Sequence, residues 1–170
     1  LGNLTSRTEA SGRAGEQRQT SYEYDARGRQ IKVTYPSVGA YSESVAALAA
    51  NGQTGLATRA DPSKTLSTQT FYDALGNAVA NVDIAGNASY KAYDSAGRVV
   101  YEVDELGYVT SYSRNSFGDA ETVLRYAAAT TLANTVPTSA SQAPSAATVS
   151  ATVNAAGVNH TADRLLGTTY

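Results

Sequence analysis

The sequence predicts an all-β protein made of antiparallel β-hairpins that repeat about every 21 residues and add to one continuous twisted sheet. An Asp or Asn recurs three residues ahead of a Gly along most of the chain, and the segments between these pairs have the length and composition of strands. The aromatic set is also unusual, with 12 Tyr against 2 Phe and no Trp. Tyrosine suits sheet surfaces that are apolar at the ring and hydrated at the hydroxyl.

The acid–glycine pairs define the period. From Asp73 onward the acids follow one another at steps of 10, 11, 10 and 11 residues, so two half-repeats make one repeat of 21. Tyr precedes the acid in one kind of half-repeat and Val precedes it in the other. The six pairs are Asp25/Gly28, Asp73/Gly76, Asp83/Gly86, Asp94/Gly97, Asp104/Gly107 and Asn115/Gly118.

Each pair is predicted to be a structural turn that reverses the chain. Asp or Asn at the first position of a type I turn accepts a backbone N–H two residues on, and Gly at the fourth position adopts a positive φ. A type I turn closed by such a glycine is a common hairpin connection. Neighbouring strands should therefore be antiparallel.

The segments between the turns, such as RVVYEV and YVTSYSR, are rich in Val, Tyr and Thr. Counting back by twos from the residue ahead of each acid predicts one aromatic and β-branched face and one wetter face that includes Glu102, Ser111 and Ser113. The predicted aromatic face contains Val103, Tyr101, Val99, Tyr112, Thr110, Tyr108, Tyr24 and Tyr22.

Two stretches interrupt the register, and we expect insertions at 36–60 and 127–162. In the first, Ser42 is a helix-capping residue and Asn51-Gly52 a stop signal, which predicts a short helix between them. The second is rich in Ala, Ser and Thr. This composition favours a surface insertion with a partial helix around 142–156, with disorder as the alternative.

A chain of 170 residues suits one domain, so we expect residues 1–170 to be a single repeat segment. The chain has no Met, even at position 1, and Gly2 and Gly12 continue the ten-residue step, which indicates a fragment of a longer polypeptide. The net charge of -2 includes no basic block, so nucleic acid is not an expected partner. Membrane insertion is not expected either, because no apolar run approaches the roughly 18 residues of a span.

The segments YEYDARGRQIKVTYP, FYDALGNAVANVD and YKAYDSAGRVVYEVDELGYVTSYSRNSFGDAETVLRY resemble the YD repeats of RHS-repeat proteins. That motif runs Y-D-x-x-G-R and then D-x-x-G-x-x-x-x-Y over about 20 residues. The resemblance covers nearly the whole chain outside the two insertions. Arg29 and Arg98 fit the G-R position of the motif, whereas Asn77 and Asn87 depart from it.

The resemblance implies a ribbon of hairpins that spirals into a hollow shell. In bacterial toxin-complex components and polymorphic toxins of this family the shell encloses a C-terminal toxin domain, and related repeats in animal teneurins serve adhesion. We therefore expect a non-enzymatic structural segment that encapsulates or presents a toxin or effector cargo. The expected partners are flanking repeats of the same polypeptide and the enclosed toxin domain, and the expected location is secreted or at the cell surface.

A carbohydrate-binding or adhesive surface module is the alternative, because rows of exposed aromatic rings can stack on sugars. Packing against neighbouring strands is the interpretation that we favour for these rings. The tyrosines that could contact a glycan are Tyr22, Tyr24, Tyr93, Tyr101 and Tyr112.

No catalytic, cofactor or metal site is expected. Acids ten residues apart along a meander lie at alternate edges of a sheet and do not converge on one ion. His160 is the only histidine, no Cys is present, and no neighbouring acid marks a catalytic group, so an ordinary loop histidine is expected. Glu102 and Glu105 suggest a glycosidase pair by proximity alone, and we expect both to be solvated.

Overall fold

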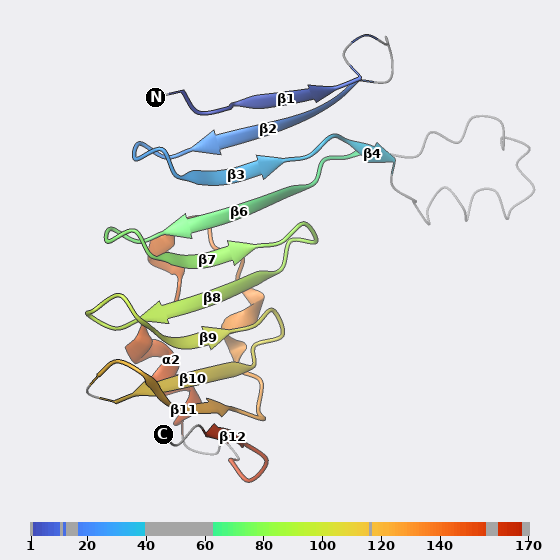
Figure 1. Cartoon of the computed structure of the whole chain (residues 1–170). Coiled ribbons are helices and arrows are strands. Elements are labelled where there is room, and N and C mark those ends of the chain that lie inside the picture. Colours follow the sequence, from blue (N-terminus) through green and yellow to red (C-terminus); the bar gives the residue numbers. More distant parts are fainter. Residues whose placement is uncertain are drawn as a thin grey trace, which may run out of the picture. The chain divides into compact units, whose positions relative to one another are not determined.

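The structure is a computed structural model that describes residues 2–10, 12, 17–39, 63–115, 117–155 and 160–167. The helix expected between Ser42 and Asn51 lies outside the described residues. The chain divides into two compact units, Leu1–Ser67 and Thr68–Tyr170. Both units consist mainly of antiparallel strands, and the predicted all-β hairpin fold is confirmed (Figure 1).

The N-terminal unit contains three consecutive strands, β1 (Ser6–Glu9), β2 (Arg18–Tyr24) and β3 (Gln30–Thr34), which pair in sequence order. Two short strands, β4 (Val38–Gly39) and β5 (Ser63–Lys64), pair with each other. Val33 of β3 lies opposite Tyr22 of β2 and is buried. These strands therefore follow the hairpin pattern that the Asp25/Gly28 pair predicts.

The C-terminal unit is a meander in which strands adjacent in sequence are adjacent in the sheet. A long insertion separates the last two strands and contains two 3-10 helices, η2 (Thr131–Asn134) and η3 (Ala140–Gln142), and one α-helix, α2 (Ala146–Val153). The strands are β6 (Ser67–Tyr72), β7 (Ala78–Val82), β8 (Ala88–Tyr93), β9 (Val99–Val103), β10 (Val109–Arg114), β11 (Ala120–Arg125) and β12 (Arg164–Gly167).

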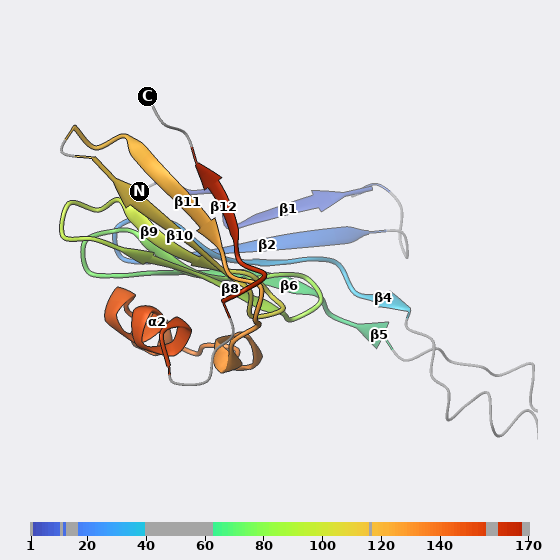
Figure 2. The same cartoon turned by 90° about the horizontal axis from the view of Figure 1, so that it is seen from below.

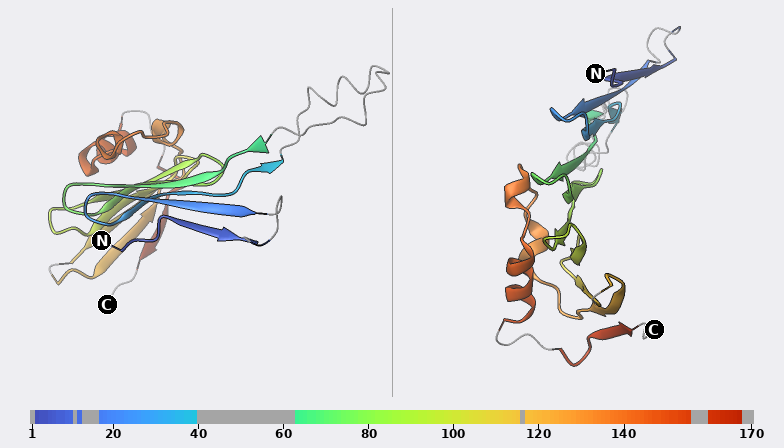
Figure 3. Two further views of the ribbon diagram at one scale, coloured as in Figure 1. Left: turned by 90° about the horizontal axis from the view of Figure 1, so that it is seen from above. Right: turned by 60° about the vertical axis from the view of Figure 1, so that its left-hand side comes forward.

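Helix α2 covers one face of β8 and β9 (Figures 2 and 3). It begins after Ser145, whose hydroxyl accepts the Thr148 N–H at 3.2 Å and caps the first turn. The helix lies within the range 142–156 where the sequence predicts a partial helix. The Tyr90 hydroxyl donates a hydrogen bond to the Thr135 carbonyl and so ties the insertion to the sheet. None of the described helices combines the length and apolar character of a membrane span.

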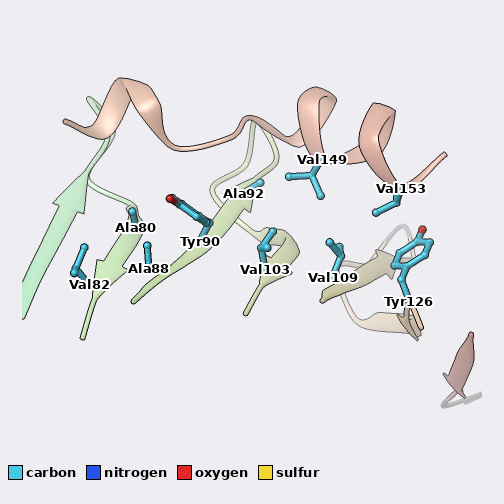
Figure 4. Close-up of a cluster of buried hydrophobic side chains, with 10 residues drawn as sticks. All are labelled: Ala80, Val82, Ala88, Tyr90, Ala92, Val103, Val109, Tyr126, Val149 and Val153. Carbon is cyan, nitrogen blue, oxygen red and sulfur yellow. The ribbon is translucent and has the colours of Figure 1, made fainter. Parts of the chain in front are cut away.

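The face under α2, here called the packed face, carries the hydrophobic core (Figure 4). Val149 and Val153 on the helix meet small and β-branched residues of the strands, which leaves these side chains almost without solvent contact. The buried cluster consists of Ala80, Val82, Ala88, Tyr90, Ala92, Val103, Val109, Tyr126, Val149 and Val153.

The opposite face, here called the open face, is polar. Lys91 of β8 lies across from Glu102 of β9, and Glu102 lies across from Thr110 of β10. The Thr70 hydroxyl of β6 donates to the Asn81 side chain of β7 at 3.0 Å. The two faces of this sheet therefore differ in chemistry, as expected where only one face is packed.

The prediction of a single aromatic face is wrong. Val103 and Tyr101 are on the packed face, where Val109 and Ser111 lie across from them. Tyr112 is on the open face with Glu102. The reason is that the residue ahead of the acid is on the packed face in a Val half-repeat and on the open face in a Tyr half-repeat.

A β-bulge distinguishes the two kinds of half-repeat. Ala92 pairs with Tyr101, but the next pair is Tyr93 with Val99, so Val100 is an extra residue in β9. Register shifts also occur in the β2–β3, β6–β7 and β10–β11 hairpins. The hairpins that follow Val82 and Val103 have no such shift in their described pairs. A bulge increases local twist and re-aims the following side chains, so it explains why counting by twos fails in β9.

Candidate functional site

The repeated acids and glycines form the turns of the hairpins. At the Asp94 turn, the Asp94 carbonyl accepts the Gly97 N–H at 3.0 Å and the Asp94 N–H donates to the Arg98 carbonyl at 2.9 Å. The same two backbone bonds occur at Asp25, Asp73, Asp83, Asp104 and Asn115. All six turn glycines have a φ between 75° and 104°. They are Gly28, Gly76, Gly86, Gly97, Gly107 and Gly118.

Each turn acid directs at least one carboxylate oxygen back into its own turn. Oδ1 of Asp94 accepts the N–H groups of Ala96 and Arg98 at 2.9 Å each, and Oδ2 accepts Arg98 Nε at 2.8 Å. Asn115 uses its side-chain oxygen in the same way, accepting the N–H groups of Phe117 and Asp119. The carboxylates are therefore already engaged by local donors.

These hydrogen bonds favour the ionised form of the acids. The backbone N–H of Arg98 is the main cause that lowers the pKa of Asp94, and Arg29 and Asn87 have the same effect on the pKa of Asp25 and Asp83. Burial acts to raise the pKa of Asp73, but hydrogen bonds from Asn77 and Gly76 outweigh it and leave that pKa below 3.8. A depressed pKa here reflects turn formation and gives no sign of acid–base chemistry.

At two turns, the residue after the turn glycine lies close to the corresponding glycine of the next repeat. Arg98 NH1 lies 3.3 Å from the position that a Cβ on Gly118 would occupy, and Asn77 Oδ1 lies 3.6 Å from that position on Gly97. In the N-terminal unit, Asn3 Nδ2 donates to the Gly28 carbonyl at 3.3 Å. Arg98 and Asn77 thus each bring a polar side chain to the corresponding turn of the next repeat.

The tyrosines proposed to contact sugars do not form one exposed row. Tyr101 packs against the hydrophobic core, and the Tyr93 hydroxyl donates to the Ala78 carbonyl at 2.9 Å. In the N-terminal unit, the Tyr24 hydroxyl donates to the Leu4 carbonyl at 2.9 Å, and Tyr22 pairs across the sheet with Val33. All of these tyrosines are half-buried.

A polar network on the open face joins three strands. Lys91 Nζ lies 2.9 Å from Glu102 Oε1, and the Tyr112 hydroxyl donates to Glu102 Oε2 at 2.7 Å. Glu102 is therefore not the freely solvated carboxylate that the sequence predicts. Ser89 and Thr110 flank the network and line a shallow depression of about 240 Å³.

The network changes the protonation of its members. Burial acts to raise the pKa of Glu102, but the hydrogen bonds from Tyr112 and Lys91 outweigh it, so that pKa is lowered. Burial and the hydrogen bond to Glu102 raise the pKa of Tyr112 to about 12. The hydrogen bond to Glu102 also raises the pKa of Lys91. At neutral pH the network thus holds one ammonium, one carboxylate and one neutral phenol.

His160 and Ala127, near the two ends of the insertion, both contact the Asp163 carboxylate. His160 Nδ1 lies 2.7 Å from Asp163 Oδ2, while Asp163 Oδ1 accepts the Ala127 N–H at 2.7 Å. Asp163, three residues after His160, is thus a neighbouring acid that the sequence-based expectation of an ordinary loop histidine did not include. Across the described part of the chain, no three His, Cys, Asp or Glu residues are grouped as a metal site would require.

The Asp25 turn belongs to the part of the chain that matches a known protein family. Residues 1–37 match the family model of the RHS repeat. This match identifies an RHS-repeat sequence in residues 1–37. A search of curated proteins found no match to the chain.

RHS repeats are structural repeats, and the structure gives a physical reason for three positions of their motif. Asp94 and Gly97 form the turn, since one supplies the acceptors and the other the positive φ. Arg98 binds Asp94 and extends to Gly118 of the next repeat. The Asp25 turn of the matched segment has the same arrangement, with Arg29 Nε 2.7 Å from Asp25 Oδ2.

Sequence reasoning missed the Lys91–Glu102–Tyr112 network. A signal was present, because Lys91 and Glu102 are placed nearly symmetrically about the Asp94 turn and carry opposite charges. The extra residue of the bulge must be known before the two can be assigned to the same face.

Proposed function

We propose that this RHS-repeat segment forms part of a β-sheet wall that encloses or presents a separate toxin or effector domain, in a protein that is secreted or displayed at the cell surface. The segment itself acts as architecture. Its partners are flanking repeats of the same polypeptide and a C-terminal cargo domain.

The observation that carries this proposal is the way the open face satisfies its own charges. Lys91 is paired with Glu102, and Asp104 with Arg125 at 2.9 Å. Paired charges of this kind keep a surface hydrated and weaken its attraction for a chain that lies against it. A wall of this kind can enclose a polypeptide that does not bind tightly to it.

The edge strands support the role of flanking repeats. In the described residues, β1 pairs only with β2, and β12 pairs only with β11. An edge strand has a row of free backbone donors and acceptors that another strand can use. Further hairpins of the same type would satisfy these groups.

Limited proteolysis tests the proposal. The polypeptide that carries this segment, its flanking repeats and the C-terminal domain is digested beside the C-terminal domain expressed alone. We expect the domain to be protected only in the longer polypeptide, and a Gly97→Val/Gly118→Val variant, which strains two turns of the wall, to reduce the protection. Equal cleavage rates in the two polypeptides would contradict enclosure.

The carbohydrate-binding alternative is tested by the same tyrosines that suggested it. Stacking on sugars requires accessible ring faces, but the candidate rings are half-buried. The Tyr93 and Tyr112 hydroxyls also donate hydrogen bonds to acceptors on neighbouring strands. Glycan-array binding that is lost in a Tyr112→Ala variant would favour this alternative over the wall.

A further inference from the structure

Two arginines lie directly opposite each other where the insertion leaves and rejoins the sheet. Arg125, the last residue of β11, pairs in register with Arg164, the first residue of β12. Side chains at directly opposed positions of antiparallel strands are about 5 Å apart at Cβ, and like charges there are destabilising. The sheet therefore tolerates an unfavourable charge pair at this point.

Only one of the two arginines has an acidic partner in the described part of the chain. Arg125 NH2 lies 2.9 Å from Asp104 Oδ2. The nearest acid in sequence to Arg164 is Asp163, whose oxygens are engaged by Ala127 and His160. Arg164 itself is exposed, and no ion pair with a described residue is formed by it.

Both arginines line a surface pocket of about 240 Å³. Its other walls are Tyr108, Tyr126, Ala127 and Ala162, so the lining holds two positive charges, two aromatic rings and no acid. The Arg125 guanidinium lies over the Tyr108 ring, 5.8 Å from its centroid, which helps to fix its orientation.

We propose that this pocket, defined by Arg125, Arg164, Tyr108 and Tyr126, binds the carboxylate of an acidic polypeptide segment. Planar guanidinium groups bind carboxylates through two parallel hydrogen bonds. The apolar and aromatic walls suit the carbon atoms next to that carboxylate. A pocket of about 240 Å³ is smaller than the roughly 300–1,000 Å³ of sites that hold a whole small molecule, and it fits one side chain or a chain terminus.

The choice of a polypeptide as the occupant rests on the proposed function, because a cargo chain would lie against the open face to which Arg125 belongs. The same carboxylate chemistry also occurs in uronic acid sugars. These two sources are separated by the test below.

Binding is measured by calorimetric titration of the 170-residue chain with three probes. The first is a blocked peptide with a central Glu between apolar residues, the second is the same peptide with Gln, and the third is a hexuronate disaccharide. We expect the Glu peptide to bind with an affinity that falls as salt is added, and the Gln peptide to bind at least about tenfold more weakly.

Substitution of Arg164 separates binding from folding. Arg164→Gln should weaken the Glu peptide about tenfold. Arg164→Glu should abolish binding yet raise the melting temperature by about 1–3 °C, because it replaces a like-charge pair with an opposite-charge pair. Arg7→Gln, which removes an exposed arginine paired with Glu9 in the other unit, is the control and should leave binding unchanged.

Equal binding of the Glu and Gln peptides, or binding that Arg164→Gln leaves unchanged, would overturn the site. Binding of the hexuronate without binding of the Glu peptide would overturn the polypeptide assignment. The titration needs no cargo domain, so failure of protease protection together with intact peptide binding would count against the proposed enclosure and not against this pocket.

Discussion

The Arg98 side chain lies beside Gly118 of the next repeat. Its Nε donates to Asp94 within its own turn at 2.8 Å, and its NH1 lies 3.3 Å from the site of a Cβ on Gly118, one repeat further along the chain. Gly118 has a φ of 95°. A side chain at this position is therefore opposed both by the backbone conformation and by the neighbouring arginine.

We predict that Gly118→Ala lowers the free energy of unfolding by about 1–3 kcal/mol, the usual cost of a non-glycine residue held at positive φ. Part of the loss should disappear in an Arg98→Ala background, because the new Cβ then has room. A double-mutant cycle by urea unfolding measures this coupling. Gly86→Ala is the control, since Gly86 also has a positive φ, of 92°, but a Cβ there meets nothing within 4 Å. A coupling to Arg98 as large at Gly86 as at Gly118 would contradict a clash between Arg98 and the new Cβ.

The turn acids should make the chain sensitive to acid. The pKa is lowered in the folded state at four of them, for example at Asp94, where the Arg98 N–H is the main cause; the four are Asp25, Asp73, Asp83 and Asp94. A carboxylate with a depressed folded pKa contributes stability above its unfolded pKa and loses it as the pH falls through the folded value. We therefore expect melting temperatures that hold steady from neutral pH down to about 4 and fall below it.

Asp94→Asn is the matched variant for that experiment. Asn115 shows that an amide oxygen can accept both backbone N–H groups of this turn. The variant should therefore fold at neutral pH and show a smaller loss of melting temperature between pH 4 and pH 2, as measured by circular dichroism. An unchanged acid profile would show that Asp94 does not contribute to it.

The helix of the insertion should contribute to stability through one buried contact surface. Val149 of α2 has a relative exposure of 0%, whereas Val136 in the same insertion is 49% exposed. We predict that Val149→Ala lowers the free energy of unfolding by about 1.5–3 kcal/mol, with at most about 0.7 kcal/mol regained from the higher helix propensity of Ala. Val136→Ala should change it by less than about 0.5 kcal/mol. The free energies of unfolding of both variants are measured with urea. Similar losses in the two variants would contradict the packing of α2 against the sheet.

The open-face network should be visible in an alkaline titration. Burial and the Glu102 hydrogen bond raise the pKa of Tyr112 to about 12. Because this folded pKa lies above the unfolded value of 10.0, the stabilisation is complete below pH 10 and is lost as the pH rises through about 12. Burial also raises the pKa of Tyr90 and Tyr93, so tyrosinate absorbance should show several late-titrating tyrosines, of which the step near pH 12 disappears in Tyr112→Phe.

Glu102→Gln provides the control for that assignment. It removes the negative charge beside the phenol and should move the late titration toward pH 10 while leaving Tyr112 in place. Tyr112→Phe should also cost about 0.5–1.5 kcal/mol for the lost hydrogen bond, as measured by urea unfolding. A late titration that persists in Glu102→Gln would assign the shift to burial alone.

The turns and the antiparallel order were predictable from the sequence because their causes are local. Asp94 and Gly97 are three residues apart, and the hydrogen bonds that define their turn join residues at most four positions apart. Such bonds depend little on the rest of the chain. For the same reason the Ser145 cap of α2 acts within three residues, although the sequence placed that helix only broadly.

The two faces and the polar sites were decided by tertiary structure. A single extra residue, Val100, changes which side chains of β9 point to the packed face, and no local rule marks it. Only the register then brings Glu102 to Lys91 and Tyr112.

By itself, the sequence determined where the chain turns, how often it does so, and that its strands are antiparallel. The tertiary structure decided which face α2 covers, which charges are paired, and that Arg125 stands opposite Arg164 across the base of a long insertion. The physical reason is range: a turn is stabilised by hydrogen bonds among neighbouring residues, whereas a cross-strand contact depends on every register shift and inserted residue that lies between its two partners.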